Sequence, residues 1–281
     1  MMSLKILLRT KANMSLVVGG GTLCLLLGLG LLSFVWTPHD PIAIDISQRL
    51  LPPSTTAWLG TDHFGRDILS AILRATPMSL SIAMAGVVLG LVGGVPLGLM
   101  AGMVGRPLVM HGLTRLGDVL FAFPALIMAM LLTASFGAGA SIAAIAIGIF
   151  NIPVFLRITR GATLQALPQS YILSARLAGL GEVGIACRHI LPNIAPLLVV
   201  HASIQFALAV LAESALSYLG LGTQPPTPSW GRMLADSQSM LGIAPHLAIA
   251  PGGIIMVTVV AANLLGEGLR QKLDPRLAVT S

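Results

Sequence analysis

Residues 75–105 read ATPMSLSIAMAGVVLGLVGGVPLGLMAGMVG, and this stretch decides the fold class of the chain. It contains no Asp, Glu, Lys or Arg, and it exceeds the roughly 20 apolar residues that a helix needs to cross a bilayer. A helix in the core of a soluble protein rarely runs so long without a charge. The stretch therefore predicts a membrane-spanning helix.

Similar stretches recur along the chain, in which charged residues make up only 9% of the total, against about 25% in soluble proteins. Two further uncharged runs are 119–156, long enough for two helices, and 237–266. Residues 12–37 and 193–220 supply two more. The sequence thus predicts an all-α integral membrane protein with six spans, at about Met14–Trp36, Pro77–Met103, Leu113–Ser135, Ala140–Arg160, Pro192–Leu219 and His246–Leu265.

Small residues mark the second of these spans. Its glycines include several at four-residue spacing, a pattern that lets helix backbones approach closely in a membrane. We expect tight helix packing along Gly86, Gly90, Gly93, Gly94, Gly98 and Gly102.

Charge asymmetry orients the spans. With the N-terminus inside, twelve of the sixteen Lys and Arg residues fall on the cytoplasmic side and four fall outside, as the positive-inside rule requires. Both termini are then cytoplasmic. The net charge of +6 comes from basic residues that lie mostly on one side of the membrane, so it does not indicate a nucleic-acid partner.

The first apolar run could also be read as a signal peptide, with Lys5, Arg9 and Lys11 as its basic region. However, residues 14–35 are longer than an ordinary signal-peptide core, and Phe34–Pro38 offers no small-residue cleavage site. An uncleaved first span is the preferred interpretation. We divide the chain into residues 1–76, a span with an outer segment, and residues 77–281, the membrane core with an inner loop at 161–189.

The inner loop contains the polar stretch Tyr171–Asn193, YILSARLAGLGEVGIACRHILPN. Pro168 can open a short helix and Gly179 can end it in the left-handed conformation. The expected helix, Gln169–Ala178, exposes Ser174 and Arg176 beside the apolar Tyr171, Leu173 and Leu177. Such a mixed face suits docking into a groove on a partner. The alternative is a helix that merely lies on the lipid surface.

Four stretches carry a family resemblance, in matching order from about residue 36 to the C-terminus. They are LGTDHFGRD at Leu59–Asp67, ESALSYLGLGTQPPTPSWGRML at Glu213–Leu234, NLLGEGLRQKLDPRL at Asn263–Leu277, and the inner loop with Leu173-Ser174-Ala175, Gly179 and Ile190-Leu191-Pro192. Together they resemble the second permease subunit of bacterial ABC importers for dipeptides, oligopeptides and nickel. Two motifs depart from that family: the glutamate and first alanine of its Glu-Ala-Ala motif are absent, and Ala75-Thr76-Pro77 stands where Gly-x-Arg is usual.

The resemblance implies a type I permease fold in the bacterial inner membrane. It implies four partners: a homologous second permease, two ATPase subunits that use ATP and Mg²⁺, and an extracytoplasmic binding protein. The implied ATPase-coupling residues are Leu173, Ser174, Ala175, Arg176 and Gly179. The implied substrates are peptides or nickel, and the Arg74-Ala75-Thr76 and Ser174-Ala175-Arg176 variants lean slightly toward nickel permeases.

The chain itself has no sequence signature of catalysis. A P-loop needs a lysine after glycine to reach the phosphates, and none of Lys5, Lys11 and Lys272 follows a glycine. No His-Glu-x-x-His or Gly-x-Ser-x-Gly motif occurs either. We therefore expect no catalytic residue and no cofactor in this chain. An intramembrane enzyme and a passive channel are the rival functions; the first lacks catalytic groups and the second needs no docking loop.

Polar residues within spans are costly and usually functional. His201 and Gln205 lie four residues apart on one helix face and either line a translocation path or bond to the partner permease. Glu213 either caps or pairs, with Arg232 as a partner, or contacts substrate. Asp118 is explained by a helix N-terminus, whose dipole favours a carboxylate.

The outer segments are expected to shape the external mouth. Asp62 and Asp67 can pair with Arg66 or contact the binding protein, since loops carry such surfaces. The outer histidines His39, His63 and His246 show no ligand spacing, so no metal site is predicted.

Overall fold

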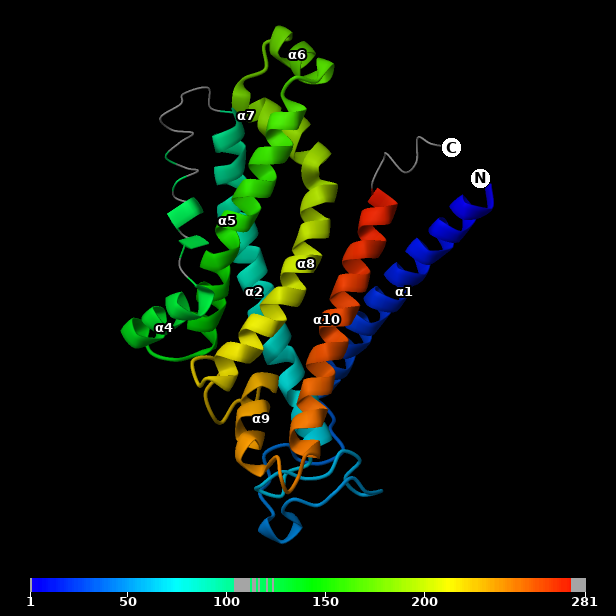
Figure 1. Ribbon diagram of the computed structural model, residues 1–281, viewed down its shortest axis with the longest axis vertical. Coiled ribbons are helices and arrows are strands. Elements are labelled where there is room, and N and C mark those ends of the chain that lie inside the picture. Colours follow the sequence, from blue (N-terminus) through cyan, green and yellow to red (C-terminus); the bar gives the residue numbers. More distant parts are fainter. Residues whose placement is uncertain are drawn as a thin grey trace.

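The computed structural model describes residues 2–103 and 124–273, together with residues 112, 115, 117–119, 121 and 122. This part of the chain is mostly helical, and its only β-type pairing is an isolated antiparallel bridge between Thr61 and Asp67. The all-α prediction is therefore confirmed for these residues (Figure 1).

Five segments of helix are long and apolar enough to cross a membrane. They belong to α1 (Met2–Leu32), α2 (Ile68–Met103), α5 (Ala140–Ala166), α8 (Leu191–Tyr218) with the helical turns before it, and α10 (His246–Leu273). The shorter apolar helix α4 spans Ala125–Phe136. Within the predicted third span, 113–135, residues 113, 114, 116, 120 and 123 lie outside the described residues, and α4 is too short to count among the five long helices. The count of six spans therefore stays a prediction.

Several helix boundaries differ from the predicted ones. Helix α2 begins at Ile68 and not at Pro77, because the Asp67 carboxylate accepts a hydrogen bond from the Ser70 backbone N–H at 2.9 Å and caps the first turn. The end of the expected outer segment, 68–76, is therefore helical, and the division at residue 76 falls within α2. Two helices also run past their predicted ends: α5 passes Arg160 to reach Ala166, and α10 passes Leu265 to reach Leu273.

The predicted start of the fifth span at Pro192 is wrong, because the helix is already ten residues long there. Helix α7 (Glu182–Ile185) passes through the π-helical turn η2 (Ala186–Ile190) directly into α8. The wider π turn precedes Pro192, whose ring would clash with a carbonyl one turn back in a regular α-helix. Residues 182–218 therefore form one continuous helix.

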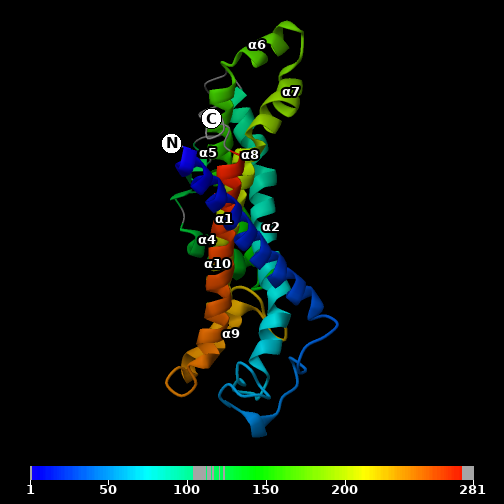
Figure 2. The same cartoon turned by 90° about the vertical axis from the view of Figure 1, so that its right-hand side faces the viewer.

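The closest helix packing is between α2 and α5, which run side by side in both views (Figures 1 and 2). A Cβ atom added to Gly90 would lie 2.3 Å from Asn151 Cβ, and one added to Gly94 would lie 2.5 Å from the Ile152 carbonyl oxygen. The same close approach occurs at Gly86, Gly98 and Gly102. The glycine pattern thus correctly predicted a backbone-close helix interface.

The remaining helices pack around this pair. Helix α8 contacts both α2 and α5, α10 contacts α8, and α1 lies against α10. The central apolar cluster includes Val87 of α2, Phe155 of α5 and Val210 of α8, all with at most 2% of their surface exposed.

The two ends of the molecule differ. Helix α6 (Ser170–Leu177) lies at one end (top of Figure 1), and the start of α1 and the end of α10 point toward the same end. The opposite end carries residues 33–67 and α9 (Trp230–Ser237), a short helix that the sequence analysis had treated as loop.

A substitution in the α2–α5 interface tests the role of the glycines. We expect Gly90→Ala to destabilise the protein by about 1–3 kcal/mol, because the added methyl group overpacks the contact with Asn151. Gly161→Ala in α5 is the control: an added Cβ there meets no atom within 4 Å, and alanine favours helix. Thermal unfolding in detergent measures both variants. Equal transition temperatures would contradict an essential glycine contact.

Candidate docking helix and membrane cavity

Helix α6 is a defined element within the predicted inner loop. Gln169 and Ala178 are its caps, so the expected helix Gln169–Ala178 is confirmed, while Pro168 lies one residue before the N-cap. Gly179 has φ +82°. Its N–H donates to the Arg176 carbonyl at 3.0 Å, and the Leu180 N–H donates to the Ala175 carbonyl at 3.1 Å. These two bonds form a Schellman motif, which explains why glycine occupies position 179.

The two faces of α6 have different surroundings. Ile172 and Ala175 are buried and belong to the central apolar cluster. Leu173 and Leu177 point outward with exposed fractions of 49% and 90%. Exposed leucines that share one face of a helix form a surface suited to a partner.

The predicted coupling residues therefore fall into three groups. Leu173, Ser174 and Arg176 are exposed, whereas Ala175 is 7% exposed and faces inward. Ala175 therefore does not present its side chain to a partner, because it packs within the central apolar cluster. Gly179 acts through its backbone conformation alone.

Two polar contacts that the sequence analysis missed link α6 to the next helix. Arg176 donates from Nε and Nη2 to the two carboxylate oxygens of Glu182 at 3.0 and 3.1 Å. Asn193 Nδ2 donates to Tyr171 Oη at 2.7 Å. Each pair spans a turn of the chain, so neither follows the i, i+4 spacing that would reveal it in a sequence.

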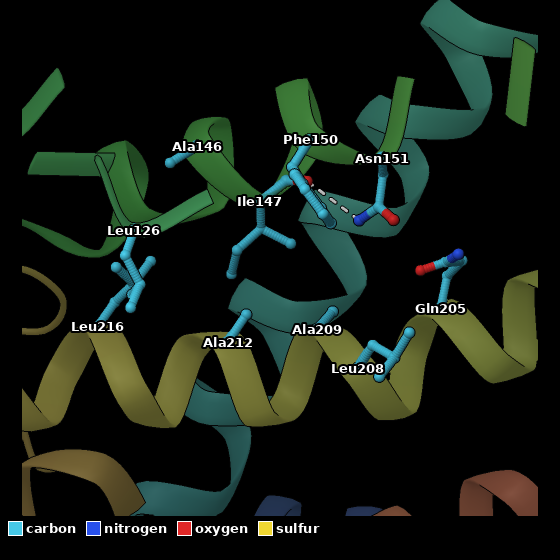
Figure 3. A pocket seen from close by; sticks show the side chains of 10 residues that line it. All are labelled: Leu126, Ala146, Ile147, Phe150, Asn151, Gln205, Leu208, Ala209, Ala212 and Leu216. Carbon is cyan, nitrogen blue, oxygen red and sulfur yellow. Dashed lines mark hydrogen bonds between the residues drawn. The ribbon is translucent and has the colours of Figure 1, made fainter. Parts of the chain in front are cut away.

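A cavity of about 70 Å³ lies between α4, α5 and α8. Its walls are mostly apolar, and two amides, Asn151 and Gln205, lie at one end of it (Figure 3). Asn151 Nδ2 donates to the Ile147 carbonyl at 3.0 Å, while its Oδ1 has no partner among the described residues. The other lining residues are Leu126, Ala146, Ile147, Phe150, Leu208, Ala209, Ala212 and Leu216.

The three predicted path residues separate in space. Gln205 lines the cavity and is 9% exposed. His201, one turn away, is half-buried and does not line it. Asn151 was not singled out from the sequence, although an amide within an uncharged span was a signal that could have found it.

Glu213 occupies a separate, fully buried site where α8 meets α2 and α9. Ser217 Oγ donates to its Oε1 at 2.8 Å, and the hydroxyls of Ser79, Ser214 and Ser229 lie around the same carboxyl group. The expected pairing with Arg232 is wrong, because the Arg232 Nε lies 3.1 Å from Asp236 Oδ1, one helical turn away.

Other ion pairs revise the remaining predictions. Asp118 pairs with Arg157 of α5 at 2.5 Å, so its position is not explained by a helix terminus alone. Asp62 pairs with Arg66 at 2.7 Å, as expected. Asp67 instead caps α2 and lies 3.7 Å from His39 Nδ1.

This geometry defines a class of protein: a polytopic membrane protein with a short helix at one end that exposes apolar side chains. Residues 94–279 match the family model for the inner membrane component of binding-protein-dependent transport systems. The chain belongs to this family and is a multi-pass protein of the inner membrane.

Individual relatives support the same assignment. The chain is 44% identical to the glutathione transport system permease GsiD of Pectobacterium atrosepticum, over 80% of this chain and 74% of the relative. It is 38% identical to the di/tripeptide permease DppC of Pseudomonas aeruginosa, over 92% and 88% of the two chains. The resemblance to second permeases of the peptide group is thereby confirmed.

The fold also has a counterpart among solved structures. A chain of the inward-facing MetNI methionine ABC transporter aligns with a TM-score of 0.61, covering 72% of this chain and 95% of the other, at 15% identity. This likeness establishes a shared permease fold.

The end of α6 offers a test with a matched control. We expect Gly179→Val to destabilise the Schellman turn by about 1–3 kcal/mol, because valine strongly disfavours φ +82°. Gly181→Val should be tolerated, because Gly181 is extended at φ −71°. Hydrogen exchange at the Leu180 amide should accelerate about tenfold or more in the first variant only. Equal protection in both variants would refute the requirement for glycine.

Proposed function

We propose that this chain is a permease subunit of an ATP-driven importer and that α6 docks into an ATPase subunit. The observation that carries the proposal is the outward apolar face of α6, with Leu177 90% exposed, in a member of a transport-permease family. An isolated eight-residue helix is unstable in water. Here its buried face holds it in place and leaves the other face free for a partner.

The proposed assembly contains four partners: a homologous permease, two ATPases and an extracytoplasmic binding protein. ATP and Mg²⁺ would be used by the ATPases alone, since this chain offers no P-loop lysine. Leu173, Ser174, Leu177 and Arg176 would form the contact. Binding of ATP would then shift the helices between two states that differ in their partner contacts.

The cavity at Asn151 and Gln205 is our candidate for part of the translocation path. Its two uncharged amides can exchange hydrogen bonds with a passing polar group without burying a charge in the membrane. His201 remains a candidate contact for the partner permease. Glu213 is assigned a structural role, because serine hydroxyls surround its carboxyl group.

Peptides are the proposed substrates. The similar permeases are named for transport of glutathione and of di- and tripeptides, and both substrate groups carry peptide amides. The nickel alternative draws no support from these names. The binding protein is expected to select the substrate.

We further propose that the α6 end faces the cytoplasm, together with both termini. Single cysteines replacing Ser174 and Ser239, two exposed serines at opposite ends, test this orientation in a background that lacks Cys24 and Cys187. A membrane-impermeant maleimide added to intact spheroplasts should label Ser239→Cys, and Ser174→Cys only after permeabilisation. The reverse pattern would invert the proposed topology.

Docking itself is tested by Leu177→Asp. A carboxylate in the contact would have to be buried without a partner, so we expect the ATPase subunits to co-purify at less than a tenth of the normal amount. Uptake of labelled dipeptide and glutathione should fall in parallel.

Ile243→Asp is the matched control for this experiment. Ile243 is 75% exposed and belongs to the segment that joins α9 to α10, at the end of the molecule opposite α6 (Figure 1), so its substitution should leave the ATPases bound. Full ATPase binding by Leu177→Asp would contradict docking through this face of α6.

A further inference from the structure

Helix α6 is held by two polar contacts at its opposite ends. Tyr171, the second residue of α6, accepts a hydrogen bond from Asn193 at 2.7 Å. Arg176, the last residue but one, forms a bidentate pair with Glu182 at 3.0 and 3.1 Å. These two contacts are called the brace below.

Both partners in the brace belong to one rigid element. Glu182 opens α7 and Asn193 lies in the first turn of α8, within the continuous helix 182–218. They are eleven positions apart along this helix (from 182 to 193), which corresponds to roughly 16 Å at the α-helical rise of 1.5 Å per residue. The order of the contacts is antiparallel, so α6 is fastened along its length to the start of the long helix.

The Schellman bonds at Gly179 and Leu180 fix the end of α6, but they join α6 to its own last turn and do not reach α8. Residues 179–181 join α6 to α7, and a side chain at Gly179 or Gly181 would meet no atom within 4 Å. The buried Ile172 and Ala175 seat α6 by apolar contact, which is not directional. A bidentate guanidinium–carboxylate pair, by contrast, fixes orientation as well as distance.

We propose that Glu182 and Asn193 are positioning residues that make α6 and α8 move as one body. The inference rests on the proposed docking of α6 to an ATPase. Motion of the ATPase would then reach α8, which carries Gln205 in the membrane cavity. Without the brace, α6 would turn about the glycine linker, and ATP would be hydrolysed with less transport.

The experiment uses the complete transporter in liposomes with its binding protein and measures labelled dipeptide imported per ATP hydrolysed. In Glu182→Gln with Asn193→Leu, we expect the ATPases to stay bound and this ratio to fall about three- to tenfold, the range for two exposed polar contacts. Arg176→Glu alone should also lower the ratio. Adding Glu182→Arg to that variant should raise it again, because the pair is re-formed with reversed charges.

A matched control comes from α10, where Gln271 Nε2 donates to Glu267 Oε1 at 2.7 Å. This pair is exposed, near the same end of the molecule, and lies within one helix. Glu267→Gln with Gln271→Leu should leave the ratio unchanged.

Two results would overturn the brace: an unchanged ratio in the Glu182 and Asn193 double variant, or release of the ATPases from it, which would make these residues direct contacts. Failure of the proposed function looks different, since the wild-type chain would then co-purify with no ATPase.

Discussion

The close approach of α2 and α5 is the constraint on which the rest of the structure depends. Lipid is as apolar as leucine, so helices in a membrane associate through van der Waals contact and hydrogen bonds. Glycines at 86, 90, 94, 98 and 102 remove every side chain from one stripe of α2, and α5 fills that stripe with Ile147, Asn151, Phe155, Thr159 and Thr163. A slip of one residue would place a branched side chain against the α5 backbone. The stripe therefore fixes register as well as distance.

This fixed pair positions the polar groups of the membrane region. Asn151 packs its Cβ against Gly90 and turns its amide to the cavity, so the helix interface sets where that amide lies relative to Gln205 of α8. Ser79 of α2 and Ser229 before α9 approach Glu213 of α8. A buried polar group without a hydrogen-bond partner is costly. The partners of Glu213 come from different elements, so these contacts help to hold α8 and α9 against α2.

Sequence reasoning succeeded where a single element decides the outcome. The uncharged runs predicted the long helices, the glycine spacing predicted a close helix contact along α2, and Gly179 predicted the end of α6. It failed at the choice of ion-pair partner: Arg232 pairs with Asp236, one turn along α9, and not with Glu213, and Arg176 pairs with Glu182 across the turn after α6. Two helices also start earlier than predicted. The cap at Asp67 lets α2 begin at Ile68, and the π turn before Pro192 lets the helix before α8 continue into it. Ion-pair partners and helix starts depend on the three-dimensional arrangement of the side chains, which the spacing of residues in the sequence does not determine.

The contacts that stabilise α6 leave one of its faces exposed. Eight residues are too few for a helix to persist by propensity, so Ile172 and Ala175, the Schellman turn at Gly179 and the contacts to Glu182 and Asn193 supply the order. All of these use the inner side or the two ends of the helix. Leu173 and Leu177 point outward and do not contribute to this stabilisation. A helix that is ordered before a partner binds loses little conformational entropy on binding, which suits the docking role that we propose for this face.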